Sequence, residues 1–162
     1  MKTISKTLLY LQMTALFLTA AFAGPVAEKG LPFRGTVQAV ETSIIQPPIL
    51  AVYGGGFGNG TTLGRFTVIY EVAVNLSTRA SIGSAHFITA NGDSIFTELI
   101  GQGHPIEGSD LSLIVEMNVI TGGTGRFARA TGRFTAERLL NRITGVTTGS
   151  FSGTIILDDR RP

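Results

Sequence analysis

The feature that most constrains this chain is an alternation of apolar and polar residues with a period of two. In residues 63–75, Phe66, Val68, Tyr70, Val72 and Val74 fall on one face, and mainly polar residues fall between them. Successive side chains of a β-strand point to opposite faces, so this segment is expected to bury one face against a core. The same alternation recurs in residues 33–41, 80–90, 94–103, 111–121, 132–140 and 147–157, and no stretch after residue 24 repeats with the period of a helix. The sequence therefore predicts an all-β domain.

Turn residues divide the alternating segments at the spacing of hairpins. Asn91-Gly92-Asp93 separates two of them, and Asn-Gly accepts the positive φ angles of a tight hairpin. Gly108-Ser109-Asp110 marks another turn, and the 21 glycines are about twice the average usage. Seven or eight strands at this spacing predict a closed antiparallel barrel, with a β-sandwich as the alternative.

Residues 42–62 are expected to form a long loop. They contain Pro47-Pro48 and two glycine-rich runs, at 54–56 and 58–60. Apolar residues such as Ile44, Leu50 and Phe57 are scattered among them, which is unusual for a solvated linker. Because of these apolar residues, we expect the segment to pack as a flap or plug over an opening, or to include a short edge strand. Loops of this length in compact domains are often functional.

Residues 120–135 contain two Gly-Arg-Phe units and are expected to form a corner between strands. Clustered glycines take positive φ at no steric cost, and the two phenylalanines would anchor the segment in the core. A phosphate-binding loop at 122–126 is disfavoured because no helix and no Lys-Ser/Thr pair follows it. The residues assigned to this structural corner are Gly122, Gly123, Gly125, Phe127, Gly132 and Phe134.

The N-terminus has the three parts of a secretory signal. Lys2 and Lys6 give a positive start, residues 8–22 are mainly apolar, and residues 21–23 read Ala-Phe-Ala, so cleavage before Gly24 is expected. An uncleaved anchor is the alternative, but the apolar run is shorter than the ~20 residues of a spanning helix. The prediction is a secreted or periplasmic protein exported by a Sec-type signal. Its segments are a signal peptide at 1–23, a flexible segment at 24–32, the β-barrel at 33–158 and a polar tail at 159–162.

Charge and composition exclude several functions. Without Lys2 and Lys6, the 13 basic residues become 11 and balance the 11 acidic ones. A neutral chain does not favour nucleic-acid binding. The chain has no cysteine, so disulfides, thiolate metal sites and cysteine nucleophiles are impossible. A local basic run is expected to be solvated surface, with a contact to an anion or polysaccharide as the alternative; it comprises Arg126, Arg129, Arg133, Arg138 and Arg142.

Four segments together resemble bacterial exported proteins of the allene oxide cyclase barrel-like family. They read GRFT at 64–67, FITANGDSIF at 87–96, ITGGTGRFARATGRFT at 120–135 and GSFSGTI at 149–155. Plant dirigent proteins are similar more distantly, through a Gly-Gly-(Thr/Ser)-Gly-(Arg/Lys)-Phe segment. The resemblance implies a calycin-like barrel of eight strands around an apolar cavity. It implies no catalytic residues here, because the family's acidic and polar groups have no matching motif, although Glu41 and Pro47 are of suitable types.

The apolar faces predict what lines the cavity. With these faces inward, the lining is expected to include Phe66, Val68, Tyr70, Thr97, Leu99, Val115 and Met117, with Tyr70 and Thr97 as its only polar groups. Glu71, Glu98 and Glu116 fall on the opposite parity and are expected in solvent. The sequence thus predicts a dry or lipid-like cavity, since a buried unpaired carboxylate is costly.

No catalytic centre is evident, and no metal or cofactor is expected. His86 and His104 are not at metal-ligand spacing, and no serine sits in a Gly-x-Ser-x-Gly elbow. Two functions remain. The first is a non-enzymatic barrel that binds a small apolar molecule or has a structural role; it is based on an uncharged inward face, and a polar, carboxylate-lined cavity would overturn it. The second is an isomerase or cyclase of an apolar substrate, or a dirigent-like coupling guide. A third possibility, an outer-membrane barrel, is disfavoured because the strands show no aromatic girdles and such a barrel would put polar residues inside. We expect no nucleic-acid partner and no membrane association after signal cleavage, and the resemblance implies a homo-oligomer.

Overall fold

The computed structural model describes residues 30–158, and the predicted signal peptide and polar tail lie outside this range. The described chain is all-β and forms a closed antiparallel barrel of eight strands, which confirms the predicted fold. The strands are β1 (Leu31–Gln46), β2 (Ile49–Gly60), β3 (Gly64–Asn75), β4 (Ala80–Thr89), β5 (Ser94–Pro105), β6 (Leu111–Gly123), β7 (Thr131–Asn141) and β8 (Val146–Ile156). The barrel thus begins within the segment 24–32 that was expected to be flexible.

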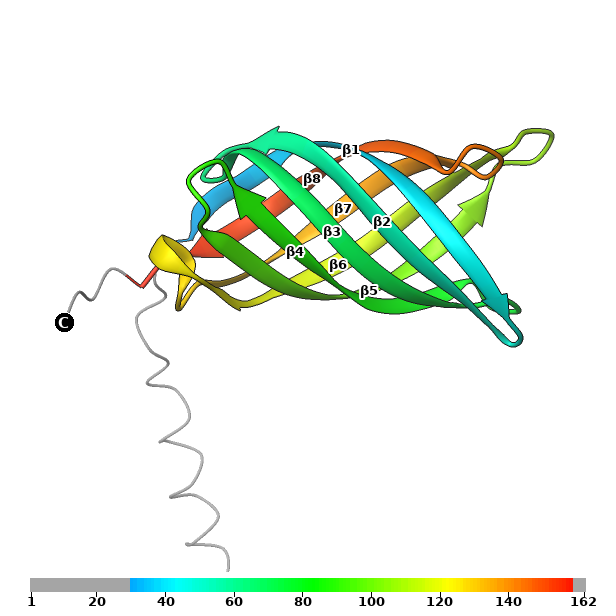
Figure 1. Ribbon diagram of the computed structural model, residues 1–162, viewed down its shortest axis with the longest axis horizontal. Coiled ribbons are helices and arrows are strands. Elements are labelled where there is room, and N and C mark those ends of the chain that lie inside the picture. Colours follow the sequence, from blue (N-terminus) through cyan, green and yellow to red (C-terminus); the bar gives the residue numbers. More distant parts are fainter. Residues whose placement is uncertain (1–29, 159–162) are drawn as a thin grey trace, which may run out of the picture.

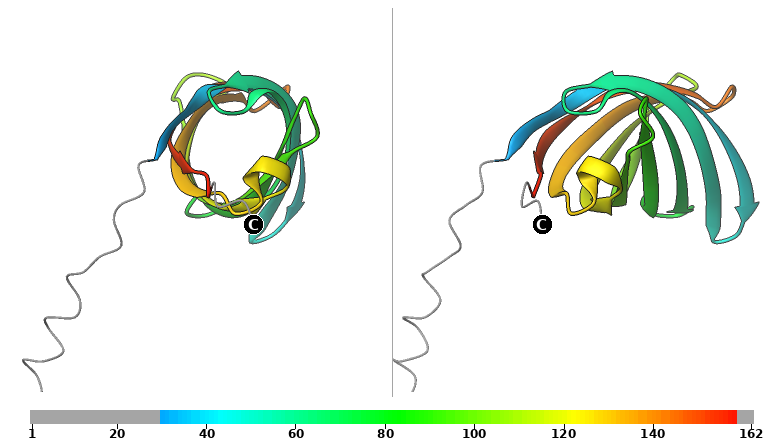
Figure 2. Two further views of the ribbon diagram at one scale, coloured as in Figure 1. Left: turned by 90° about the vertical axis from the view of Figure 1, so that its left-hand side faces the viewer. Right: turned by 60° about the vertical axis from the view of Figure 1, so that its left-hand side comes forward.

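Each strand pairs with its neighbour in the sequence, and β1 closes the barrel against β8 (Figure 1). Four hairpin turns, at 46–49, 75–80, 105–111 and 141–146, gather at one end, which we call the hairpin end. The opposite end carries the 3₁₀ helix η1 (Gly125–Phe127), which lies beside the barrel rim (Figure 2). We call it the η1 end, and the two ends enclose different interiors.

The prediction of a long loop at residues 42–62 is wrong. β1 continues to Gln46, the chain turns at Pro47-Pro48, and β2 starts at Ile49, so that Gln46 pairs with Ile49 and Gly35 with Gly60. The segment is a long hairpin whose glycines belong to a strand. Glycine in a strand often marks a place where another group approaches the backbone closely.

The glycines of β2 make room for aromatic rings of β3. A Cβ atom on Gly54 would overlap the ring of Tyr70, and one on Gly58 would overlap the ring of Phe66. Because these positions face the interior, β2 contributes backbone instead of side chains to that wall. The rings of β3 can therefore reach toward the barrel axis.

A cluster of phenylalanines fills the η1 end. Five rings, from Phe33, Phe66, Phe87, Phe134 and Phe151, pack with centroids 5.1 to 6.4 Å apart, mostly tilted or edge-to-face. This is the arrangement that aromatic quadrupoles favour. These rings make a solid core at this end of the barrel.

The corner at residues 122–132 caps the phenylalanine core. Gly122, Gly125 and Gly132 all have positive φ, and Phe127 of η1 is fully buried. A Cβ atom on Gly123 would meet the backbone oxygen of Ser94. The corner therefore needs glycine for its conformation at three positions and for close packing at the fourth.

The predicted orientation of β6 is wrong. Met117 is 59% exposed and faces outward, with Val115 on the same side, whereas Glu116 is only 5% exposed and faces the interior. The more apolar face of this strand thus points away from the core. The reason is the interior itself, because Glu116 and its inward neighbour Asn118 both find polar partners there.

Candidate functional site

Arg138 lies at the centre of a polar cluster in the middle of the barrel. It projects inward from β7 and is 6% exposed, so the expectation that it belongs to a solvated basic run is wrong. Its guanidinium donates two hydrogen bonds to Glu116 of β6, from Nε to Oε2 at 3.1 Å and from Nη2 to Oε1 at 2.9 Å. This bidentate geometry is the strongest that an arginine and a carboxylate can form.

The third nitrogen of the Arg138 guanidinium, Nη1, contacts side chains from three other strands. Nη1 donates to Glu41 Oε1 of β1, to the hydroxyl oxygen of Tyr70 of β3 at 3.2 Å and to Thr147 Oγ1 of β8 at 3.2 Å. The Tyr70 hydroxyl in turn donates to Glu41 Oε1 at 2.8 Å. We call Glu41, Tyr70, Glu116, Arg138 and Thr147 the Arg138 cluster.

The surroundings fix the protonation of two members of this cluster. Burial is the main reason why the pKa of the Tyr70 phenol lies well above its usual value, and the nearby carboxylates add to this rise. Burial alone would lower the pKa of Arg138, but Glu116 and Glu41 outweigh it and raise the pKa above its ordinary range. At neutral pH Tyr70 is therefore a hydrogen-bond donor and Arg138 is a cation.

Glu41 is the member of the cluster that keeps an unused hydrogen-bond acceptor. Both of its contacts with Arg138 and Tyr70 use Oε1, and Oε2 has no hydrogen bond with any residue of the described chain. With both carboxyls ionised, the cluster carries one positive and two negative charges. A ligand that donates a hydrogen bond to Oε2 would therefore be favoured there.

A second polar pair lies on the side of the cluster nearer the phenylalanine core. The buried Thr97 hydroxyl donates to Asn118 Oδ1 at 3.1 Å. Asn118 also lines a small internal cavity of about 40 Å³, together with Tyr70, Arg138 and Phe151. This space is large enough for a water molecule.

On its other side, the Arg138 cluster forms the floor of a funnel that opens at the hairpin end. The funnel has a volume of about 310 Å³. Its apolar walls come from Leu50, Val52, Val72, Val74, Ile114 and Leu140. Glu41, Glu116 and Arg138 all line it, so polar groups are accessible at the bottom of an apolar passage.

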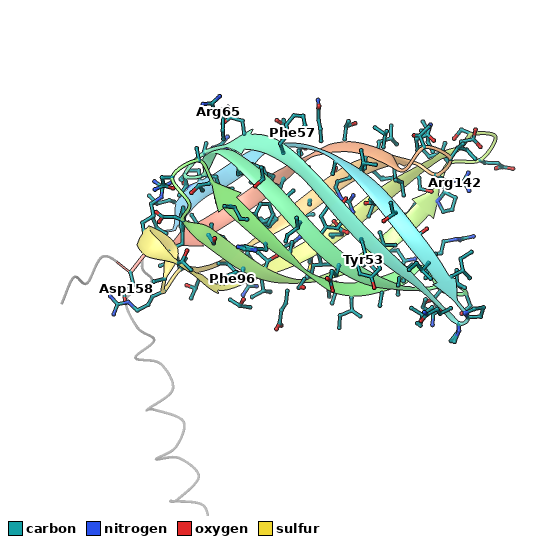
Figure 3. The ribbon with its side chains drawn as sticks, viewed as in Figure 1. Tyr53, Phe57, Arg65, Phe96, Arg142 and Asp158 are labelled. Carbon is teal, nitrogen blue, oxygen red and sulfur yellow. The ribbon has the colours of Figure 1, made fainter. Side chains whose placement is uncertain are left out.

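Two arginines lie at the rim of the funnel. Arg142 holds the backbone oxygens of Ser109 and Asp110 across the β5–β6 turn, and Figure 3 shows it at the hairpin end, far from Asp158. Arg79 sits in the β3–β4 turn. Within residues 30–158 neither arginine forms an ion pair. Both line the funnel, whereas the acidic Glu107 and Asp110 of the β5–β6 turn lie at the same end without lining it.

The structure places the predicted cavity residues unevenly. Phe66, Val68, Tyr70, Thr97 and Leu99 face the interior. Val68, Tyr70 and Leu99 line the small internal cavity, but none of the five lines the funnel. Val115 and Met117 lie outside the barrel. Only Tyr70 belongs to the Arg138 cluster, and the expectation that Tyr70 and Thr97 are the only polar interior groups is wrong.

The sequence contained a signal for the residues that were missed. The alternation that puts Val37 and Ala39 inside reaches Glu41 at its next step, and the one that puts Phe134 and Ala136 inside reaches Arg138. A charged residue at the next inward position is easily overlooked, because charge normally marks the outer face of a strand. Glu116 was missed because β6 was assigned the wrong face.

The other polar candidates lie on the outer side of the barrel, where Glu71, His86 and Glu98 line one open groove of about 470 Å³. Glu71 and Glu98 are exposed, as expected from their parity. Among residues 30–158, no group of His, Asp and Glu is arranged to hold a metal ion. His86 packs against Phe96 with ring centroids 4.7 Å apart, and its buried Nε2 has no hydrogen-bond partner.

Within residues 30–158, no helix has the length and apolarity needed to cross a membrane.

The site thus combines an apolar funnel, two arginines at its rim and a buried polar floor. The short motifs that carry the resemblance to allene oxide cyclase barrels contain none of the residues that line the funnel. Comparison with models of known protein families, with curated proteins and with solved structures found no match to this chain.

Proposed function

We propose that this barrel binds one small, mainly apolar molecule in the funnel at its hairpin end. The observation that carries the proposal is the funnel itself, which has apolar walls and about 310 Å³ of space. Ligand sites in proteins are typically concave and apolar with a few placed polar groups. Glu41 Oε2 would accept a hydrogen bond from the ligand, and the rim arginines favour a ligand that carries an anionic group at its outer end.

The dry, uncharged cavity predicted from the sequence is wrong, because Glu41 and Glu116 line the funnel, and the proposed ligand changes accordingly. A purely dry container would have no reason to hold Glu41 and Glu116 in contact with its cavity. An apolar molecule with a polar group at its inner end fits better, because that group can replace the water that would otherwise solvate Glu41. The ligand is therefore expected to be amphipathic, as a hydroxylated lipid, terpenoid or phenolic would be.

The test is native mass spectrometry of the purified protein followed by titration with 1-anilinonaphthalene-8-sulfonate, which is apolar and anionic. Leu50→Trp should fill the funnel and weaken binding of this probe at least tenfold. Tyr53→Trp, on the outer face of the same strand, is the matched control and should bind as the parent does. Equal binding by both variants would reject the funnel as the site.

An isomerase or cyclase is the second candidate, and the pairing of Tyr70 with Glu41 favours it. An isomerisation needs a group that removes a proton and returns it elsewhere, without an oxidant. Glu41 Oε2 is the one carboxylate oxygen in the cluster that is not already hydrogen-bonded within the described chain. Glu41→Gln should keep binding the molecule found by mass spectrometry but lose its conversion, and unchanged conversion would exclude this role.

Export to the periplasm or the medium is part of the proposal and rests on residues 1–23. Lys2, Lys6 and the Ala-Phe-Ala site at 21–23 support it. N-terminal sequencing of the protein from its natural compartment should give Gly24 as the first residue. A chain that retains Met1, or that stays in the cytoplasm, would exclude it.

A further inference from the structure

The outer face of β6 is an apolar stripe. Leu113, Val115, Met117 and Val119 all point outward, and Met117 and Val119 are more than half exposed. The inward face of the same strand carries the polar side chains of the candidate site. A strand that presents its more apolar face to water is unfavourable in a monomer, because burial of that face would contribute about 25 cal/mol per Å².

The stripe continues onto the neighbouring strands. Ile82 of β4, Ile100 of β5 and Met117 of β6 stand opposite one another in register, and each is more than half exposed. A shallow groove runs along this row, lined by Ile82, Ile100, Met117 and Val119 among others. Single exposed apolar residues are normal, whereas a contiguous row of them marks a contact surface.

Charges of opposite sign flank the stripe at the same level. Glu98 of β5 and Arg133 of β7 both stand opposite Val119, one on each side of β6. Adjacent strands are about 4.8 Å apart, so the two charges are equidistant from β6. Neither forms an ion pair or a side-chain hydrogen bond with any residue of the described chain.

We propose that this face binds a second copy of the chain through a two-fold axis parallel to β6. Rotation about that axis exchanges the two sides of β6, so it brings Glu98 against the partner's Arg133 and the reverse. The β6 stripes of the two copies then meet on the axis, as in two sheets packed about 10 Å apart. This arrangement is isologous, as homodimer interfaces usually are.

The surrounding residues agree with this axis. It places Ile100 across from Thr135, and Gln102 across from Glu137, which can accept a hydrogen bond from the Gln102 amide. A two-fold axis perpendicular to β6 would instead bring each flank against itself and lose both ion pairs. An anionic lipid surface fits poorly, because Glu98 and Glu137 lie within the patch. The proposal does not depend on what the funnel binds.

The test is the molar mass of the purified protein in solution, measured by light scattering and sedimentation over a range of concentrations. The parent protein is expected to be a dimer, and Met117→Lys should raise the dissociation constant of the dimer at least tenfold. Phe57→Lys is the matched control, because Phe57 is 62% exposed on the outer face of β2, the strand farthest from β6 in the closed barrel. Circular dichroism checks that both variants keep the barrel.

Charge exchange tests the axis itself. Glu98→Arg should weaken the dimer, because it sets two cations against each other, and the double variant Glu98→Arg/Arg133→Glu should restore it. A monomeric parent protein, a dimer insensitive to Met117→Lys, or a double variant no stronger than Glu98→Arg would each overturn the proposal. An assembly with another symmetry would also overturn it.

Discussion

Arg138 occupies an inward position of β7 that follows Phe134 and Ala136 in the same alternation. It is the only cation among the groups that meet at the floor of the funnel, and Glu41 and Glu116 both depend on it. Arg138→Met should lower the free energy of unfolding by about 3–5 kcal/mol, because two buried carboxylates lose their counter-charge. Urea unfolding of the variant measures this loss.

The control for Arg138→Met removes the stranded charges as well. The triple variant Arg138→Met/Glu41→Gln/Glu116→Gln should recover most of the lost stability, because no buried ion is then left unpaired. If the single variant were as stable as the parent protein, the cluster would not be an ionic one. If the triple variant were no better than the single, packing rather than charge would explain the loss.

Tyr70 makes stability depend on pH at the alkaline end. Its pKa is raised in the folded state above the unfolded value of about 10, chiefly by burial, so the phenol ionises first in the unfolded chain. Above pH 10, ionisation of the phenol lowers the free energy of the unfolded state. The contribution of Tyr70 to the free energy of unfolding is therefore fully present below about pH 10 and should be lost as the pH rises above it. Thermal melts between pH 9 and 11.5 should show this decline in the parent protein and a smaller one in Tyr70→Phe. An equal decline in both would contradict the assignment.

At the scale of elements, β2 shows how glycine shapes a barrel wall. Gly54 faces inward against the ring of Tyr70, whereas a Cβ atom on the outward-facing Gly55 would have its nearest neighbour 4.0 Å away. Gly54→Ala should destabilise the protein by about 1–3 kcal/mol, because the added methyl group forces Tyr70 to move. Gly55→Ala is the matched control and should be neutral or slightly stabilising. Chemical unfolding compares them, and equal effects would contradict this account of β2.

The whole molecule has one solid end and one hollow end. At the η1 end, Ile155 is fully buried beside the phenylalanine core, whereas Leu50 lines the funnel at the other end. Ile155→Ala should cost about 2–5 kcal/mol, because it opens a cavity in a packed region. Leu50→Ala should cost less, because its side chain already borders open space, and it should change ligand binding instead. Thermal unfolding distinguishes the two, and a larger cost at Leu50 would refute this division.

Local patterns in the chain were enough to predict seven of the eight strands and to favour a closed antiparallel barrel over a sandwich. Period-two alternation and turn glycines are local signals, so β3, the β4–β5 hairpin at Asn91-Gly92 and the corner around Phe127 could all be inferred from neighbouring residues. These signals failed where they conflicted. Glycines at 54–60 suggested a loop, because nothing local shows that Tyr70 and Phe66 would need that space.

The inward face of β6 and the contents of the cavity depend instead on contacts between distant segments. Leu113, Met117 and Val119 form the more apolar face, and alternation alone would bury them. The closed barrel turns Glu116 inward, where Arg138 of the adjacent strand pairs with it and Glu41 and Tyr70 complete the network. A buried charge is tolerable only when its partners are in place, and those partners lie up to 97 residues apart in the chain. That physical condition is a property of the closed barrel, and no single segment of the sequence contains it.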